Sequence, residues 1–351
     1  MTAARVRAAF LHQAIACETL GSPFTARLCR LAGERLAPRG AVGTRILGWP
    51  GDPSAVGDSV PLRLAGALHA LVLAKRSDAL AALYPPTDAE VSDDAFWEVV
   101  EEVLRIEEAF ILHRLDGPPQ TNEVRRSAAL LPMFLMVQQR TGLPLVLSEV
   151  GASAGLNLFL DSYRITLGAQ SWGDIASPVR IRPKWRGRAA AGLALNIAAR
   201  AGCDLLPVDP SATDDRERML SFIWPDQPDR LARTRAAFDI AASKDIRVEK
   251  CDAIDWLGRR LATPMPGFVH VVYSTIAWQY FPAEKQAQGA ALIRAAGERA
   301  SEEAPLVWAQ MEGDGGRPGA ALLLTLWPGG TMRLVGRADY HGRWVDWKGL
   351  G

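Results

Sequence analysis

Hydrophobic and polar positions follow two different patterns along the chain. In the first third, apolar residues recur every three or four positions, as Phe96, Val100 and Val103 do, which is the repeat of amphipathic helices. Further on, apolar runs of strand length alternate with helical stretches. The change predicts an all-helical N-terminal or cap domain, residues 1–117, followed by an α/β domain, residues 118–351.

Five segments in the second domain predict strands, and helical or loop segments separate them. These runs are Leu145–Leu147, Ala201–Val208, Ile246–Cys251, Phe268–Tyr273 and Pro305–Ala309. Such alternation is typical of a doubly wound parallel sheet. Near the end, Leu322–Trp327 and Thr331–Val335 flank a Pro-Gly-Gly turn, which predicts an antiparallel hairpin. We therefore expect a mostly parallel sheet with a C-terminal antiparallel hairpin.

The rest of the chain is organised around the stretch Leu145–Leu158, which reads LVLSEVGASAGLNL. The apolar start predicts a buried strand, and Gly151 lets the backbone turn tightly at its end. Ser153 is a predicted N-cap for a following helix, because its hydroxyl can accept a hydrogen bond from a free amide. A strand, glycine turn and helix form a ligand cradle at the carboxyl edge of a parallel sheet. A purely structural turn would use the same residues, and that alternative stays open.

Several common sites are disfavoured by this stretch. The dinucleotide fingerprint G-x-G-x-x-G is absent, and Glu149 would repel a pyrophosphate, which argues against an NAD-linked enzyme. No P-loop lysine follows, and no G-x-S-x-G elbow of a hydrolase is present. A cationic ligand without phosphate fits the acid better.

Composition limits the remaining classes. The 351 residues carry a formal net charge of +1, so there is no strong nucleic-acid signal. The four cysteines form no C-x-x-C pair and no zinc-type cluster, so we expect no metal site. No leader and no membrane-length apolar run are visible, which predicts a cytoplasmic protein without membrane contact.

Basic residues alternate along the predicted strand Val179–Trp185, so an extended chain would expose them on one face. They are Arg180, Arg182, Lys184, Arg186 and Arg188. Such a face could meet a phosphate-bearing substrate, or it could be the solvated side of an edge strand. Both alternatives stay open.

The pattern E-x-G-x-S-x-G at 149–155 resembles the first motif of S-adenosylmethionine-dependent methyltransferases of the Rossmann-like type, commonly acidic-x-G-x-G-x-G. Ser153 replaces the middle glycine. Four segments together also resemble an uncharacterised bacterial domain-of-unknown-function family, number 2332. These segments are TNEV at 121–124, EVGASAGLNL at 149–158, IWPD at 223–226 and YST at 273–275. Both resemblances imply a methyltransferase-like sheet; the second adds a helical N-terminal part but no activity.

The methyltransferase resemblance implies a set of cofactor-binding residues at strand ends and in the glycine turn. They are Glu149, Gly151, Ser153, Gly155, Asp209, Asp252, Ala253 and Ser274. In that family an acid after the second strand accepts from the ribose hydroxyls, which suggests Asp209, with Asp204 in reserve. Asp252 matches the acid that accepts from the adenine amino group, and Ala253 would lie beside the ring.

Six further residues are candidates for the substrate pocket: Asn122, Glu123, Asn157, Thr275, Trp278 and Tyr280. Asn122 and Glu123 follow Thr121, the predicted N-cap of a helix that leads into the central strand. Each candidate also has a structural alternative, since strand-end acids cap helices and aromatic residues pack. Catalytic residues stay unassigned.

The resulting hypothesis is a protein that binds S-adenosylmethionine and methylates a substrate that the sequence does not specify. Methyl transfer from a sulfonium depends mainly on alignment and desolvation, so the lack of a catalytic triad does not oppose it. The alternative is a non-catalytic, methyltransferase-like scaffold or interaction protein that has lost the cofactor, and Ser153 favours that alternative.

Overall fold

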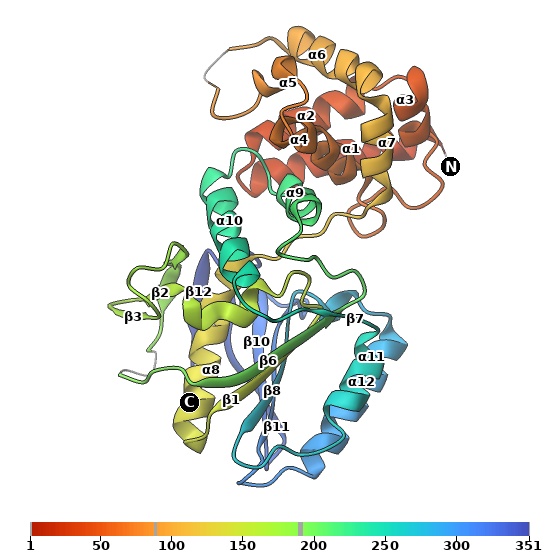
Figure 1. Ribbon diagram of the computed structural model, residues 1–351. Helices are drawn as coiled ribbons and strands as arrows, with labels where there is room; N and C mark the ends of the chain where they lie inside the picture. Colours follow the sequence, from red (N-terminus) through yellow and green to blue (C-terminus); the bar gives the residue numbers. More distant parts are fainter. Residues whose placement is uncertain (1, 88–89, 189–191, 351) are drawn as a thin grey trace. The chain divides into compact units, whose positions relative to one another are not determined.

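The computed structural model describes residues 2–87, 90–188 and 192–350, and it divides into two compact units (Figure 1). The helical unit comprises Met1–Thr121 and Ala212–Ala232, and the sheet unit comprises Asn122–Ser211 and Arg233–Gly351. The first division lies four residues after the predicted boundary at 117. Sequence periodicity did not indicate that a later segment returns to the helical unit.

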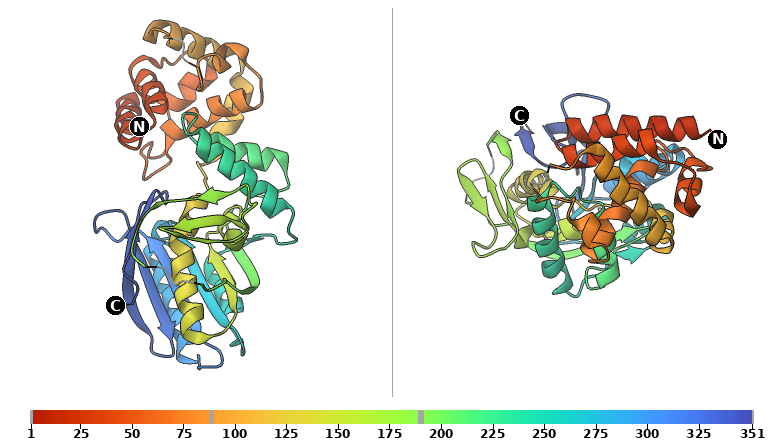
Figure 2. Two further views of the ribbon diagram at one scale, coloured as in Figure 1. Left: turned by 90° about the vertical axis from the view of Figure 1, so that its left-hand side faces the viewer. Right: turned by 90° about the horizontal axis from the view of Figure 1, so that it is seen from above.

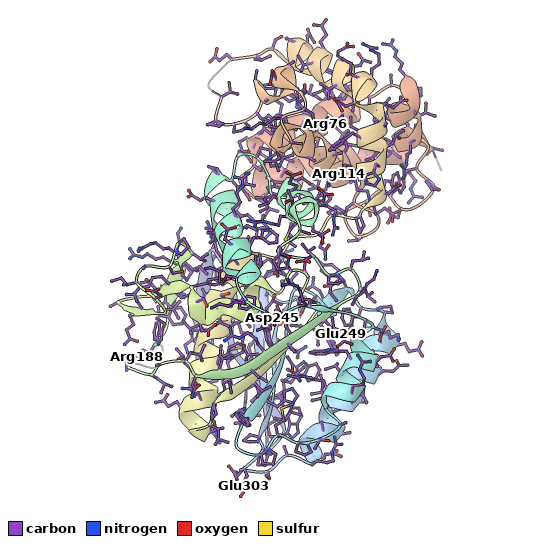
Figure 3. All side chains as sticks on the ribbon, viewed as in Figure 1. Arg76, Arg114, Arg188, Asp245, Glu249 and Glu303 are labelled. Carbon is purple, nitrogen blue, oxygen red and sulfur yellow. The ribbon has the colours of Figure 1, made fainter. Side chains whose placement is uncertain are left out.

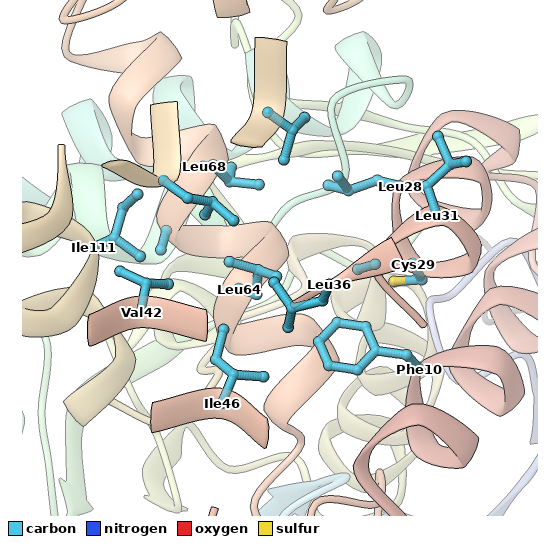
Figure 4. Packing of buried hydrophobic residues seen from close by; sticks show 14 of the residues in the cluster. Phe10, Leu28, Cys29, Leu31, Leu36, Val42, Ile46, Leu64, Leu68 and Ile111 are labelled. Atoms are coloured by element: carbon cyan, nitrogen blue, oxygen red, sulfur yellow. The ribbon is translucent and has the colours of Figure 1, made fainter. Parts of the chain in front are cut away.

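The helical unit is built from short amphipathic helices around one apolar core. Its helices are α1 (Ala3–Thr19), α2 (Pro23–Arg35), α3 (Gly40–Leu47), α4 (Val60–Leu73), α5 (Asp78–Ala81), α6 (Asp93–Ile106), α7 (Glu108–Asp116) and α9 (Thr213–Ser221). Figure 4 shows Phe10, Leu64 and Ile111 meeting in this core. Asp226, in the returning segment, accepts hydrogen bonds from Ser22 Oγ at 2.5 Å and from the Phe24 amide at 2.9 Å. The second segment is therefore bonded to the start of α2.

The sheet unit contains a nine-stranded sheet in the order β5-β12-β11-β10-β9-β8-β1-β6-β7. Its strands are β1 (Leu145–Val150), β5 (Lys184–Arg186), β6 (Ile197–Asp204), β7 (Glu249–Lys250), β8 (Val269–Thr275), β9 (Leu306–Glu312), β10 (Ala320–Trp327), β11 (Thr331–Ala338) and β12 (Trp344–Trp347). The strands from β7 to β9 are parallel, and β9 to β12 are antiparallel. The predicted α/β class and the C-terminal antiparallel strands are confirmed.

Helices cover both faces of the large sheet. Side chains of β1 alternate between the two faces, so neighbouring residues of this strand point toward different helices. Ser148 accepts a hydrogen bond from Arg260 of α11 (Ala253–Arg260), which packs on one face with α12 (Ala283–Glu298). On the opposite face, Tyr273 of β8 contacts Phe134 of α8 (Ser127–Thr141), with ring centroids 5.3 Å apart. Figure 2 shows the same layering from two further directions. Glu149 shares the face of Tyr273, whose hydroxyl donates to it.

Two predicted boundaries differ from the structure. The strand expected to end at Asp209 ends at Asp204, because Asp204 Oδ1 accepts the Leu206 amide at 2.9 Å and turns the chain. Thr121 does not begin a helix; Glu123 caps a 3-10 turn, η1 (Val124–Arg126), which leads into α8. The remaining helix, α10 (Pro228–Ala242), crosses the second division between the units.

The predicted basic strand is split by Pro183, which has no backbone donor for a ladder. It forms β4 (Arg180–Ile181), in a small sheet with β2 (Arg164–Leu167) and β3 (Gln170–Trp172), and β5 at the edge of the large sheet. The alternation itself is confirmed. The five basic side chains are exposed, and Figure 3 labels the last of them, Arg188.

In the part of the chain that the structure describes, no helix combines the length and apolar character that crossing a membrane requires.

Candidate functional site

A small cavity lies in the sheet unit where β1, β6 and β7 reach their carboxyl ends. It has a volume of about 130 Å³ and is lined by Gly151, Cys203, Asp204, Leu205, Cys251, Asp252, Ala253, Ile254, Phe281, Pro282 and Lys285. β1 pairs with β6 on one side and with β8 on the other, so the chain connections diverge here, as at ligand sites of open α/β sheets. The cavity is smaller than the roughly 300–1,000 Å³ of complete ligand pockets, so it matches one part of a ligand.

A larger cavity of about 560 Å³ lies between α8 and the small sheet. None of its lining residues is at the carboxyl end of a strand of the large sheet. Its one ionisable lining group, Asp161, already accepts two hydrogen bonds from Arg200, at 2.7 and 2.9 Å. The smaller cavity therefore has more charged side chains that could contact a ligand: Asp204, Asp252 and Lys285.

The turn after β1 depends on two glycines. Gly151 and Gly155 both have φ of +68°, a left-handed conformation that side chains disfavour. A Cβ on Gly151 would lie 2.5 Å from the Cβ of Ala277, and one on Gly155 would lie 2.9 Å from Cγ2 of Val248. Larger residues at either glycine would strain the fold itself, so such substitutions cannot separate binding from stability.

Ser153 does not cap a helix as predicted. It has φ of +54°, and the following 3-10 helix, η2 (Leu156–Ser162), begins after Gly155. The amide of Leu156 instead donates a hydrogen bond to Oδ1 of Asn122, at 2.8 Å. The hydroxyl of Ser153 is buried and has no hydrogen-bond partner among the described residues. A buried hydroxyl without a partner costs free energy, so Ser153 is unfavourable for stability at this position.

Most amides of the turn are already bonded within the chain. Asp204 Oδ2 accepts the Ser153 amide at 2.8 Å, and the Ala152 amide donates to the carbonyl of Cys203 at 3.0 Å. The Gly155 amide donates back to Ala152 at 2.7 Å. The turn is therefore not an open nest of amides for a phosphate, in agreement with the absence of phosphate-binding motifs.

Glu149 lies on β1 beside this turn and is 1% exposed. Tyr273 Oη donates a hydrogen bond to its Oε2 at 3.2 Å. Burial raises the pKa of Glu149 from its ordinary 4.5 to about 8, and the bond from Tyr273 only partly opposes the shift. At neutral pH the side chain is mostly a neutral acid. It is not among the residues that line the cavity.

Asp252 and Asp204 line the cavity, whereas Asp209 does not. Asp209 instead accepts hydrogen bonds from the amide and the hydroxyl of Ser211. Burial would raise the pKa of Asp252, but bonds from the Ile254 amide and from Lys285 hold it below its ordinary value. Asp252 is therefore an anion at neutral pH. The reserve candidate Asp204 occupies the place that sequence reasoning first gave to Asp209.

The other predicted residues lie at several places around the carboxyl edge. Ala253 lines the cavity, Asn157 is fully buried and accepts from Ser127 Oγ at 2.8 Å, and Tyr280 is 73% exposed. The carbonyl of Thr275 accepts from Arg126, and Trp278 packs among α11 and α12 residues. No group of metal-binding side chains occurs among residues 2–87, 90–188 and 192–350.

Glu312 is an important residue that sequence reasoning missed. It ends β9, accepts from Ser274 Oγ at 2.8 Å, and accepts from the amides of Ala277, Trp278 and Gln279 at 3.1–3.4 Å. One buried carboxylate thus holds the loop after β8, which brings Ala277 against Gly151. These contacts join positions 33 to 38 residues apart, so no local pattern could have indicated them.

His270 lies in β8 and is buried. Its Nε2 lies 2.8 Å from Ser148 Oγ, which also accepts from Arg260. Burial lowers the pKa of His270 to about 4. The pair resembles a nucleophile and base in distance, but Ser148 is fully buried, so it has no access to a substrate.

We predict that Glu149→Gln removes a pH dependence of stability. The folded pKa of Glu149 lies above the unfolded value, so ionisation favours unfolding, and the free energy of unfolding of the parent should fall between pH 4.5 and pH 8. The variant should therefore become more stable relative to the parent as pH rises through this range. Urea unfolding at pH 5 and pH 8.5 measures the difference, and equal differences at both values would contradict a neutral Glu149.

We predict that Glu312→Ala destabilises the sheet unit by at least about 1.5–3 kcal/mol, because hydrogen bonds to a charged acceptor are lost and amides are left without partners. The exposed Glu302→Ala is the matched control and should change stability by less than about 0.5 kcal/mol. Urea unfolding followed by tryptophan fluorescence provides the measurement. Equal stability of the two variants would remove Glu312 from this role.

Comparison with known proteins assigns the chain to a family and gives no activity. No curated protein matches it. Residues 7–347 match the family described as an uncharacterized protein conserved in bacteria, DUF2332, in agreement with the four sequence segments that resembled it. Because the match spans nearly the whole chain, the protein belongs to this bacterial family.

Proposed function

We propose that the sheet unit binds S-adenosylmethionine at the carboxyl ends of β1, β6 and β7 and that the protein transfers its methyl group to an acceptor. The observation that carries the proposal is the cavity, which brings Gly151, Asp204, Asp252 and Ala253 together from three neighbouring strand ends. Their order along the sheet is the order that the methyltransferase resemblance implies. Asp204 replaces Asp209 in this assignment.

The lining suits the nucleoside part of this cofactor. Carboxylates at Asp204 and Asp252 can accept from ribose hydroxyls and from an amino group, while Ile254 and Phe281 offer apolar surface to a ring. The amide of Ser153 donates to Asp204 and so fixes the position of that carboxylate at the cavity. These groups fit a ligand that is polar but carries no phosphate.

When bound, the cofactor supplies an electrophilic methyl group. The chain would contribute position and exclusion of water, which are the main requirements of such a transfer. The loop fixed by Glu312, with Ser274 beneath it, lies at the neighbouring strand end. Ser274 is 1% exposed and bonded to Glu312, so we assign it to positioning that loop.

The second candidate function is a scaffold that has lost the cofactor. The observation that favours it is the internal bonding of the turn, where Asp204 and Asn122 already occupy amides. The two functions differ in one measurable property, which is binding of the cofactor.

We predict that the full chain binds S-adenosylmethionine in titration calorimetry and that Ala253→Phe abolishes binding. The added ring would fill the cavity, while the residue keeps its place in the first turn of α11. Gly258→Phe is the matched control, because a side chain at Gly258 meets open space on the same helix. We expect parent-like binding by this control.

Absence of heat and of any thermal shift at millimolar cofactor, in a folded sample, would support the scaffold function instead. Parent-like binding by a folded Ala253→Phe variant would place the ligand outside the cavity.

A further inference from the structure

Positive charge is concentrated in one exposed segment of the sheet unit. Residues 164–188 contain six basic side chains and one acidic side chain, a net charge of +5, so the rest of the chain carries −4. The whole-chain value of +1 hides this difference, although a local field acts on anions independently of net charge. Five of the six basic side chains alternate along the chain and are exposed, and we call them the basic row: Arg180, Arg182, Lys184, Arg186 and Arg188, the last labelled in Figure 3.

Two sheets keep the basic row extended. β4 pairs with β2 of the small sheet, and β5 pairs with β12 of the large sheet. Pro183, between β4 and β5, is buried, so exposed and buried positions continue to alternate through the break. Two residues of a strand advance by about 6.6–6.8 Å, so the row presents positive charges at regular intervals over about 26 Å.

The protein itself neutralises little of this charge. Arg186 lies 3.8 Å from Asp346, and the arginine side chain is 84% exposed, so this pair is weak. Among the described residues, no carboxylate pairs with the other four members of the row. By contrast, Arg200 of the neighbouring strand β6 forms a close, half-buried pair with Asp161, at 2.7 Å. The basic row is therefore open to an anion from outside the chain.

The small sheet also brings two arginines together. Arg164 of β2 is in register with Arg180 of β4, so their side chains project from neighbouring strands on one face. Their guanidinium groups donate to the carbonyls of Gly173 and Ile175, at 3.0 Å each, and not to a carboxylate. Like charges directly opposite each other in a sheet are destabilising. Protection of an exposed strand edge requires no such pair, whereas a bound anion would neutralise it.

An aromatic side chain lies beside the basic row. Trp344 of β12 is in register with Lys184 of β5, so both side chains project from the same face of the large sheet. Trp344 is half-buried and does not belong to the fully buried core. Basic groups that follow a phosphate backbone, combined with aromatic side chains on which bases stack, are typical of surfaces that bind single-stranded nucleic acids.

We propose that the basic row, with Arg164 and Trp344, is a binding surface for a single-stranded nucleic acid. The basic side chains contact successive phosphates, and Trp344 stacks on an unpaired base. A linear row with an aromatic neighbour fits a chain of regularly spaced phosphates better than the plane of a lipid surface. The inference goes beyond the proposed function and does not depend on S-adenosylmethionine.

Fluorescence anisotropy of a labelled oligothymidylate of about 16 nucleotides, titrated with the full chain, tests the surface. The combined variant Arg182→Gln, Lys184→Gln and Arg186→Gln should bind at least tenfold more weakly than the parent. Each phosphate contact to a single strand contributes about 0.7 to the slope of log K against log salt concentration. The combined variant should therefore lose about 2 from this slope.

The matched control removes the same number of positive charges from exposed positions elsewhere in the sheet unit, by Arg235→Gln, Lys244→Gln and Arg294→Gln. Its affinity and salt slope should stay close to those of the parent. Parent-like affinity and salt slope in the basic-row variant would overturn the proposal, as would equal losses in the two combined variants.

The role of Trp344 is tested by comparing the oligothymidylate with its duplex with oligoadenylate. The parent should prefer the single strand by at least about fivefold, because only an unpaired base can stack on the indole ring. Trp344→Leu should lose this preference and keep the salt slope of the parent. Equal affinity of the parent for single strand and duplex would contradict the proposal.

Vesicles of phosphatidylcholine and phosphatidylserine provide the remaining comparison. Binding of the folded parent to these vesicles and not to the oligonucleotide would overturn the proposal in favour of a lipid surface. Absence of binding to the oligonucleotide at low salt would also overturn it. Melting temperatures within a few degrees of the parent establish that each variant is folded.

Discussion

The candidate site depends on the left-handed turn that follows β1. Within five residues the backbone takes a positive φ three times, at Gly151, Ser153 and Gly155. Two of these positions are glycines, but Ser153 carries a Cβ and pays a conformational cost of about 1–2 kcal/mol. Hydrogen bonds to residues outside the turn stabilise it. Asp204 accepts from the Ser153 amide, and Asn122 accepts from the Leu156 amide. Strain that other residues maintain is a common property of ligand sites.

The sequence predicted those parts of the fold that local pattern determines. The apolar run of β1 and its glycine turn were recognisable because a buried strand and a left-handed turn restrict residue choice directly. The parallel sheet and its antiparallel end followed from alternation of strands and helices and from the Pro-Gly-Gly turn. The family was recognisable from segments distributed over the chain, and the match over residues 7–347 confirms it.

Contacts between distant residues decided two of the outcomes that the sequence did not predict, and a local side-chain turn decided the third. The local sequence predicts a helix cap at Ser153. In the structure the Ser153 amide donates to Asp204, 51 positions later, and its hydroxyl has no partner among the described residues. Apolar residues continue past Asp204, so hydropathy extended that strand to Asp209, whereas the Asp204 side chain turns the chain earlier. Glu312 has no local motif, because its partners lie 33 to 38 residues before it.

The two candidate functions differ in how well they account for the environments of the buried acidic residues. A scaffold needs Asp204 and Glu312 to hold loops, and their bonds account fully for that task. A scaffold has less need of Glu149, because burial raises the pKa of Glu149 to about 8 and the hydrogen bond from Tyr273 is long, at 3.2 Å. A buried group with an unfavourable environment is a frequent feature of functional sites, because binding or catalysis compensates for its cost. Glu149 lies in β1 directly before the turn that borders the cavity, so we take its unfavourable environment as support for the proposed ligand over the scaffold.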